Sequence, residues 1–153
     1  AGRLQLVPSN NQFKPAVYVD YAHTPDALKN VLTSLRPHAR GKIICVFGCG
    51  GDRDKTKRPI MGRIASELAD MVVVTDDNPR SEIPDDIRNE IMAGAPAAIS
   101  IAGRRDAIHF AIDVAAHDDI VLIAGKGHEQ GQIIGDVVEP FDDVTEAKLY
   151  LSQ

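Results

Sequence analysis

The segment TDDNPRSEIP, residues 75–84, carries side chains that could bind a small charged ligand. It follows the apolar run MVVV and places two acids, an amide, a proline and an arginine side by side. A type I turn accounts for Asp77, Asn78 and Pro79, because Asp or Asn starts such turns and proline fixes φ. A turn does not require Arg80. A guanidinium beside carboxylates suits a ligand that carries both a carboxylate and an ammonium group.

The segment GKGHE is a second candidate for ligand binding. Gly125 and Gly127 leave the backbone bare, so that a ligand can approach it closely. The side chains of Lys126, His128 and Glu129 are either ligand contacts or solvated loop residues, and the pattern leaves both interpretations open.

The segment GCGGDRDKTKRP shares only its glycines with known nucleotide-binding loops. It lacks the G-x-G-x-x-G spacing, and no glycine precedes Lys55 as the phosphate loop requires. In the segment YAHTPD, His23 could simply start a helix. Because Asp20 stands near it at the end of a predicted strand, a ligand contact is the favoured interpretation.

Composition limits the possible functions. The 153 residues suit one domain with a single sizeable core. A formal net charge of -5 argues against a nucleic-acid partner, which would need a basic stripe. No apolar run is long enough for a bilayer and no signal-peptide pattern opens the sequence, so we expect a cytoplasmic protein without a membrane partner. Cys45 and Cys49 have no partners at zinc spacing, which favours a structural over a metal or redox role.

Apolar runs and helical patterns alternate along the chain. Continuous apolar, β-branched runs predict strands covered on both faces, at residues 16–20, 42–47, 71–75, 97–101 and 120–124. Thr24 and Pro25 are typical of the start of a helix. Apolar side chains at helical spacing follow them, and the same spacing recurs within residues 60–68, 87–91 and 107–115.

This β-α alternation predicts a three-layer, Rossmann-like, doubly wound sheet of about six mostly parallel strands. We expect one antiparallel edge strand, a hairpin about Gly135-Asp136 and a last helix over residues 144–151. Residues 1–15 are interpreted as a linker or an edge strand from a preceding domain, and residues 16–153 as the domain itself. In a parallel sheet the loops YAHTPD, GCGGDRDKTKRP, DDNPR, GRRD and GKGHE would meet at one rim, where such folds bind ligands.

The motifs DYAHTPDAL, VFGCGGDRDKTKRPIMG, VVTDDNPR and LIAGKGHE resemble the carboxy-terminal domain of the Mur ligases, and most closely the members that add meso-diaminopimelate. The similarity covers nearly the whole chain. It implies a part in peptidoglycan synthesis, in which an ATP-dependent ligase joins meso-diaminopimelate to UDP-N-acetylmuramoyl-L-alanyl-D-glutamate through an acyl phosphate.

The resemblance also implies roles for individual residues. Asp77, Asn78 and Arg80 would select meso-diaminopimelate, with Arg80 binding the carboxylate that lysine lacks. Arg53 would hold the other carboxylate of the amino acid. Gly125 and Glu129 would receive its ammonium group.

Three matched residues of the first loop, Asp20, His23 and Thr24, would contact the ribose and phosphates of ATP. The phosphate loop, the Mg²⁺ ligands and the UDP-binding region of the family belong to the amino-terminal and central domains, which would be partners of this chain. The resemblance therefore implies no catalytic or metal-binding residue here, and no turnover by this chain alone.

Other functions remain possible. A sibling Mur-type ligase domain would act on another amino acid, as in murein-peptide recycling or folylpolyglutamate synthesis. A stand-alone Rossmann-like regulatory module would bind nucleotide and ignore amino acids. A pure interaction module would leave the polar loops at the rim without a role.

Overall fold

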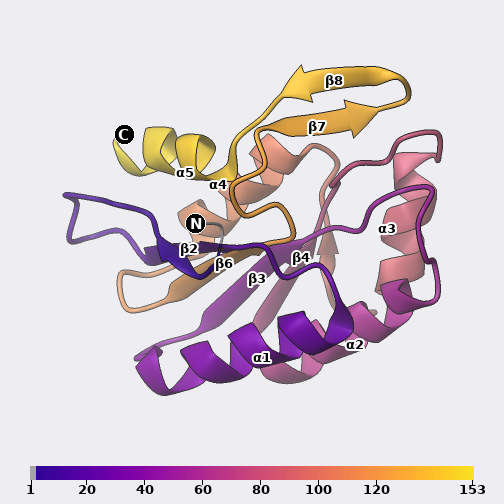
Figure 1. The fold of residues 1–153 in the computed structure, drawn as a ribbon. Coiled ribbons are helices and arrows are strands. Elements are labelled where there is room, and N and C mark those ends of the chain that lie inside the picture. The colour runs from indigo at the N-terminus through magenta and orange to yellow at the C-terminus, as the bar shows by residue number, and fades with distance from the viewer. Residues whose placement is uncertain (1–2) are drawn as a thin grey trace.

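The structure, a computed structural model, describes residues 3–153 and is built around one six-stranded sheet (Figure 1). The strand order is β1-β2-β6-β3-β4-β5, and only the edge strand β1 is antiparallel to its neighbour. The prediction of a mostly parallel, doubly wound sheet with one antiparallel edge is therefore confirmed. The strands are β1 (Gln5–Leu6), β2 (Ala16–Asp20), β3 (Ile43–Phe47), β4 (Met71–Val74), β5 (Ile99–Ser100) and β6 (Ile120–Ala124).

Helices cover both faces of the sheet and make the fold three-layered. Figure 1 shows α1 and α2 below the sheet and α4 and α5 above it. Side chains alternate accordingly along the central strand: Ile43, Cys45 and Phe47 pack with α1, α2 and α3, while Ile44 and Val46 pack with α4 and α5. The helices are α1 (Pro25–Leu35), α2 (Lys57–Leu68), α3 (Pro84–Met92), α4 (Arg104–Val114) and α5 (Asp143–Leu151), and a 3₁₀ turn, η1 (Arg36–His38), follows α1.

The start of α1 follows its sequence signals. The Oγ1 of Thr24 accepts a 3.2 Å hydrogen bond from the N–H of Ala27, and Pro25 occupies the first turn. In α2 the predicted apolar stripe is only partly buried: Met61 is covered, but Ile60 is 41% exposed. Ile60 lies at the carboxyl edge of the sheet, where it borders the pocket described below.

The predicted hairpin forms a separate two-stranded sheet of β7 (Gly131–Ile134) and β8 (Val137–Pro140). Gly135 sits in its turn with φ of 61°, a conformation that favours glycine. A single parallel bridge joins Ile134 to Arg80, in the loop after β4. The hairpin thus does not extend the main sheet; it lies across the loops at the sheet's carboxyl edge.

Both cysteine side chains are buried in the core or at its edge. Burial raises the pKa of Cys45 and that of Cys49 to about 12, so neither thiol ionises near neutral pH. Within residues 3–153, every helix is too short or too polar to cross a membrane. The division of the chain at residue 15 stays a prediction.

Candidate functional site

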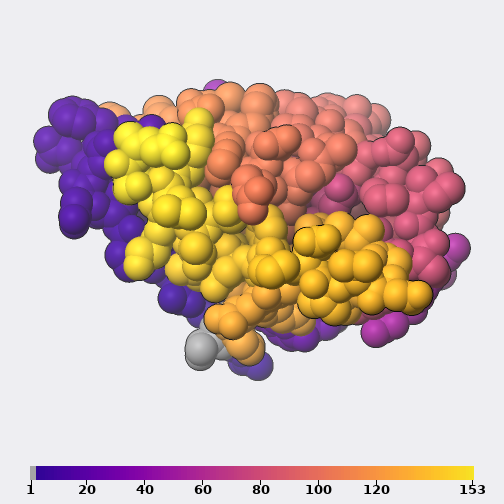
Figure 2. Space-filling model, turned by 90° about the horizontal axis from the view of Figure 1, so that it is seen from above, coloured from indigo at the N-terminus to yellow at the C-terminus, as the bar shows by residue number. Residues whose placement is uncertain are grey.

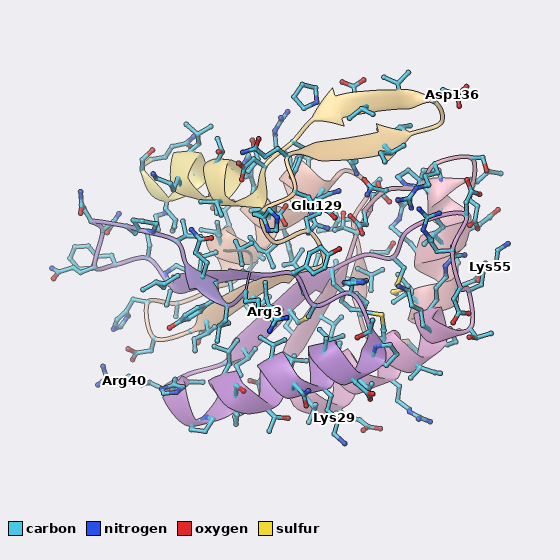
Figure 3. The ribbon with its side chains drawn as sticks, in the orientation of Figure 1. Arg3, Lys29, Arg40, Lys55, Glu129 and Asp136 are labelled. Carbon is cyan, nitrogen blue, oxygen red and sulfur yellow. The ribbon has the colours of Figure 1, made fainter. Side chains whose placement is uncertain are left out.

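The loops that follow β2, β3, β4 and β6 enclose a pocket of about 700 Å³ at the carboxyl edge of the sheet, which we call the rim pocket. In Figure 3, Glu129 lies beneath the hairpin in this region, whereas Asp136 marks the distant hairpin tip. Seen from above, the hairpin lies beside α5 (Figure 2). The pocket is lined by residues that include Tyr21, His23, Thr24, Arg53, Lys57, Ile60, Asp77, Asn78, Arg80, Gly125 and Glu129.

Eight of the nine residues predicted as site residues line the rim pocket; Asp20 does not. The Asp20 carboxylate accepts a 2.8 Å hydrogen bond from the N–H of Ala22 and another from the N–H of Leu4. It borders a neighbouring pocket of about 500 Å³, together with Arg3 and His23. Asp20 therefore shapes the turn after β2 from outside the rim pocket.

The GRRD loop lies at the carboxyl edge of the sheet, as expected, where the N–H of Gly103 donates a 2.9 Å hydrogen bond to Oδ2 of Asp76, but it does not line the rim pocket. Arg104 is fully buried and makes a two-point ion pair with Asp143, at 2.7 Å from Nε to Oδ1 and 2.7 Å from Nη2 to Oδ2. Its guanidinium also donates to the carbonyl oxygens of Asp76 and Ala124. The arginine thus ties α5 to the ends of β4 and β6, and no residue of this loop lines the pocket.

The loops after β3 and β4 interlock. The N–H of Gly51 donates a 2.7 Å hydrogen bond to the carbonyl oxygen of Asn78, and Nη1 of Arg80 donates a 2.9 Å hydrogen bond to the carbonyl oxygen of Gly51. A β-carbon at Gly51 would lie 1.9 Å from the carbonyl oxygen of Pro79, so only glycine allows this approach. Arg80 itself has φ of 51°, a left-handed conformation uncommon for residues other than glycine.

The buried side chain of Arg58 also links the loops after β3 and β4. The fully buried guanidinium of Arg58 donates to both carboxylate oxygens of Glu82, at 3.0 and 2.9 Å, and to the carbonyl oxygen of Gly50. Hydrogen bonds from Arg58 and from the N–H of Asp52 lower the pKa of Glu82 to about 2. Sequence reasoning missed this pair, although Glu82 stands within the opening motif and Arg58 within the glycine-rich segment.

Lys126 joins the loop after β6 to the loop after β4. Its side chain is fully buried, and Nζ lies 2.9 Å from each of three oxygens: Oδ1 of Asp77, Oδ1 of Asn78 and the carbonyl oxygen of Gly131. Of the two interpretations that the sequence left open for Lys126, neither describes this arrangement. The ammonium is neither solvated nor exposed in the pocket; it holds the pocket wall together.

The charges around the rim pocket alternate in sign. Arg53 and Arg80 supply cations, while Asp77 and Glu129 supply carboxylates. Nη1 of Arg53 donates a hydrogen bond to the carbonyl oxygen of Asp52, and Nη1 of Arg80 donates one to the carbonyl oxygen of Gly51. Among the described residues, no hydrogen bond engages Nε or Nη2 of Arg80, so one edge of its guanidinium is available to a ligand. Such a wall matches a molecule with separated carboxylate and ammonium groups.

Aromatic side chains form the part of the rim next to α1. The rings of Tyr21 and His23 meet edge to face, with centroids 4.5 Å apart, and the His128 ring lies 6.3 Å from that of Tyr21. Lys57 donates a 2.8 Å hydrogen bond to the carbonyl oxygen of His23. Flat rings beside an ammonium and the amino-terminal end of a helix can accept a base and a phosphate. Tyr21 was not predicted, although it stands inside the YAHTPD motif.

Across residues 3–153, no three His, Cys, Asp or Glu side chains are grouped so as to hold a metal ion. The acidic side chains of the rim pocket are committed to cationic neighbours or stand singly. These residues therefore do not fit a resident Mg²⁺ ion.

Comparison with known proteins identifies the family of this domain. The family described as Mur ligase, glutamate ligase domain, matches residues 2–127. The UDP-N-acetylmuramoyl-L-alanyl-D-glutamate-2,6-diaminopimelate ligase of Brucella melitensis biotype 1 is 58% identical over 151 residues, which cover 99% of this chain and 31% of that relative. The chain thus spans about 31% of the length of this curated relative.

Solved structures agree with this match. The structure of a UDP-N-acetylmuramoyl-L-alanyl-D-glutamate-2,6-diaminopimelate ligase superposes with a TM-score of 0.91 at 42% identity, over 99% of this chain and 31% of that one. A bifunctional folylpolyglutamate synthase/dihydrofolate synthase from Yersinia pestis, solved with AMPPNP and Mn, gives a TM-score of 0.64 at 24% identity, over 81% of this chain and 28% of that one, and shares the fold. With its motifs, its sheet and its matched residues in agreement, the chain belongs to the Mur ligase family, as the glutamate ligase domain of its members.

Proposed function

We propose that this chain is the amino-acid-selecting domain of an ATP-dependent ligase that adds meso-diaminopimelate to UDP-N-acetylmuramoyl-L-alanyl-D-glutamate in peptidoglycan synthesis. The observation that carries the proposal is the wall of the rim pocket, which Arg80 lines together with Asp77, Asn78 and Glu129. The names of the relatives at 51% to 59% identity support the same substrate.

The chemistry of selection follows from the ligand. Diaminopimelate differs from lysine by a carboxylate on its far carbon, and the free edge of Arg80 can pair with that group. Arg53, on the opposite loop, binds the carboxylate next to the reacting amine. Gly125 and Glu129 receive the ammonium group, Gly125 through a backbone left bare at φ of 120°.

The size of the discrimination can be stated. Lysine would leave the arginine edge without a partner in a closed site, which costs about 1 to 3 kcal/mol. Since about 1.4 kcal/mol is a factor of ten in affinity, the pocket favours diaminopimelate by about five- to 140-fold from this contact alone.

ATP binds across the aromatic part of the rim in this proposal. His23 and Thr24 contact its ribose and phosphates directly, while Asp20 holds the turn that carries them. ATP supplies the phosphoryl group that activates the D-glutamate carboxylate. The residues of this chain only bind and orient, and Mg²⁺ is held by the central and amino-terminal domains. We further propose that the full enzyme acts in the cytoplasm.

The test is an ATP-dependent coupling assay with the full-length protein that carries this chain, with meso-diaminopimelate or L-lysine as the amino acid. The proposal expects product with diaminopimelate and at least about fivefold less with lysine. A preference for lysine or glutamate would assign the chain to a sibling ligase. A titration of the isotope-labelled chain with ATP and each amino acid adds a binding readout. Shifts with ATP alone, and with no amino acid, would favour a nucleotide-binding regulatory module.

A further inference from the structure

The orientation of the Asn78 side-chain amide is fixed by its neighbours. Its Oδ1 receives two hydrogen bonds, one of 2.9 Å from Nζ of Lys126 and one of 2.9 Å from the backbone N–H of Ile133. Both neighbours are donors that cannot accept, so only the carbonyl end of the amide can occupy this position. Exchanging oxygen and nitrogen would place an NH₂ group against two donors.

The opposite end of the amide is left for a ligand. Asn78 lines the rim pocket, and no residue among 3–153 hydrogen-bonds to its Nδ2. The group that remains is therefore a donor with two N–H bonds. Such a group binds a carboxylate and gives nothing to an ammonium.

We propose that Lys126 is a positioning residue for substrate selection: by holding Oδ1 of Asn78, it ensures that the amide offers only donors to the incoming amino acid. This inference rests on the proposed function, in which Asn78 assists Arg80 with the far carboxylate of diaminopimelate. Lys126 acts through Asn78 and does not touch the substrate.

The surroundings of Lys126 fit this role. Its ammonium donates 2.9 Å hydrogen bonds to Oδ1 of Asn78 and to the carbonyl oxygen of Gly131, and it forms an ion pair with Oδ1 of Asp77, also at 2.9 Å. Gly131 is the first residue of β7, and Ile133, two residues later, supplies the second donor to Asn78. The ammonium therefore supplies one of the two hydrogen bonds that orient the amide, and it also holds the first residue of the strand that supplies the other.

Charge also favours lysine at this position. A fully buried cation must be paired, and the carboxylate of Asp77 lies beside it. Burial lowers the pKa of Arg104, but the carboxylate of Asp143 and, more weakly, that of Asp77 raise it above its usual value overall. Removing the lysine ammonium would leave Asp77 without this ion-pair partner. It would also leave the N–H of Ile133 as the remaining donor to Oδ1 of Asn78 among the described residues, so the amide would be held less firmly.

The experiment compares two variants of the full-length enzyme with the wild type. Lys126→Met keeps an unbranched side chain but removes the ammonium. Asn78→Asp keeps oxygens for Lys126 and Ile133 but replaces the free NH₂ group by an oxygen. Ile112→Ala, which removes a buried core side chain of α4 that does not line the pocket, is a destabilised control. For each, kcat and KM are measured with meso-diaminopimelate and with L-lysine, beside urea unfolding.

We expect Lys126→Met to raise KM for diaminopimelate by about tenfold or more and to narrow its advantage over lysine. Asn78→Asp should raise KM for diaminopimelate at least as much as Lys126→Met does. Its urea unfolding midpoint should be no lower than that of the wild type. Ile112→Ala should unfold earlier with an unchanged ratio between the two amino acids. The ratio of kcat/KM for diaminopimelate to kcat/KM for lysine therefore distinguishes a residue that positions the substrate contact from one that only stabilises the fold.

Two results would overturn the inference. One is a Lys126→Met enzyme whose ratio of kcat/KM for diaminopimelate to kcat/KM for lysine equals that of the wild type. The other is Asn78→Asp using diaminopimelate as well as the wild type does, and this variant decides the matter if Lys126→Met does not fold. A wild-type enzyme that does not use diaminopimelate would overturn the proposed function and, with it, this inference. That result is distinguishable from the two variant results above, because it concerns the wild type.

Discussion

Arg80 is tied to Gly51 across two loops by a 2.9 Å hydrogen bond from Nη1 to the carbonyl oxygen. This contact fixes one Nη atom of the guanidinium, and Arg80 lines the rim pocket. The residue is therefore aimed before any ligand arrives, which reduces the entropy lost on binding.

The first prediction concerns Arg80 in the full-length enzyme. Arg80→Ala should lower kcat/KM for meso-diaminopimelate on the order of a hundredfold, because it removes a charged, two-point contact. The value for L-lysine should change little, and steady-state kinetics with both amino acids checks this. Arg63→Ala removes an exposed arginine of α2 that pairs only with Glu67, and should behave as wild type. An equal loss for both amino acids would show that Arg80 does not select.

The second prediction concerns the contact between the loops. Gly51→Ala would place a methyl group 1.9 Å from the Pro79 carbonyl oxygen, so the loops must separate. We expect unfolding to become easier by about 1 to 3 kcal/mol and the affinity for diaminopimelate to fall as Arg80 loses its hold. Urea denaturation and calorimetric titration measure the two effects.

Gly135→Ala is the matched control for this substitution. Gly135 also has a constrained backbone, with φ of 61°, but nothing lies within 4 Å of its missing β-carbon. It should lose about 1 kcal/mol or less of stability and keep its affinity for diaminopimelate. A Gly51→Ala protein with wild-type affinity would contradict the proposed link between the two loops.

The third prediction is a pH dependence set by Glu82. Its pKa is lowered from 4.5 to about 2 by Arg58 and by the N–H of Asp52. Because the folded-state pKa lies below the unfolded one, ionised Glu82 stabilises the fold above about pH 4.5, and this contribution is lost as the pH falls toward 2. Glu82→Gln should lower the free energy of unfolding by about 1.5 to 3 kcal/mol at neutral pH.

The difference between Glu82→Gln and the wild type should shrink through this acidic window, as urea unfolding at a series of pH values would measure. Glu67→Gln serves as the comparison, because its partner Arg63 is exposed and the pair is 3.9 Å apart. It should change stability by less than about 0.5 kcal/mol at every pH. A constant difference for Glu82→Gln across the window would contradict the assignment.

The fourth prediction concerns the buried ion pair of α4 and α5. Arg104→Met leaves Asp143 fully buried without its partner, and should destabilise the chain by about 3 to 5 kcal/mol. Thermal unfolding measures this loss. The double variant Arg104→Met/Asp143→Leu should recover much of it, because replacing both partners removes the uncompensated charge. A single variant as stable as the wild type would show that the pair contributes nothing.

The sequence by itself determined the secondary structure and its order. Ile43 to Phe47, for example, form a continuous apolar run that predicts a strand, and Thr24 with Pro25 marks the start of a helix. Both signals depend only on residues that are neighbours in the sequence. Because parallel strands bring their carboxyl ends to one edge, the sequence also predicted the edge at which the rim pocket lies. The roles of Arg80 and Arg53 came from the resemblance to the family, and they remain predictions.

Only the tertiary structure decided which polar residues face the pocket and which support it. Lys126 and Asn78 stand 48 positions apart, and Arg104 and Asp143 stand 39 apart, so no local pattern records either contact. Lysine and arginine are almost never fully buried unless paired. From sequence alone, such residues are therefore expected to be exposed to solvent. Their burial depends on partners that distant elements supply, and those partners come together only when the sheet, the helices and the hairpin are packed.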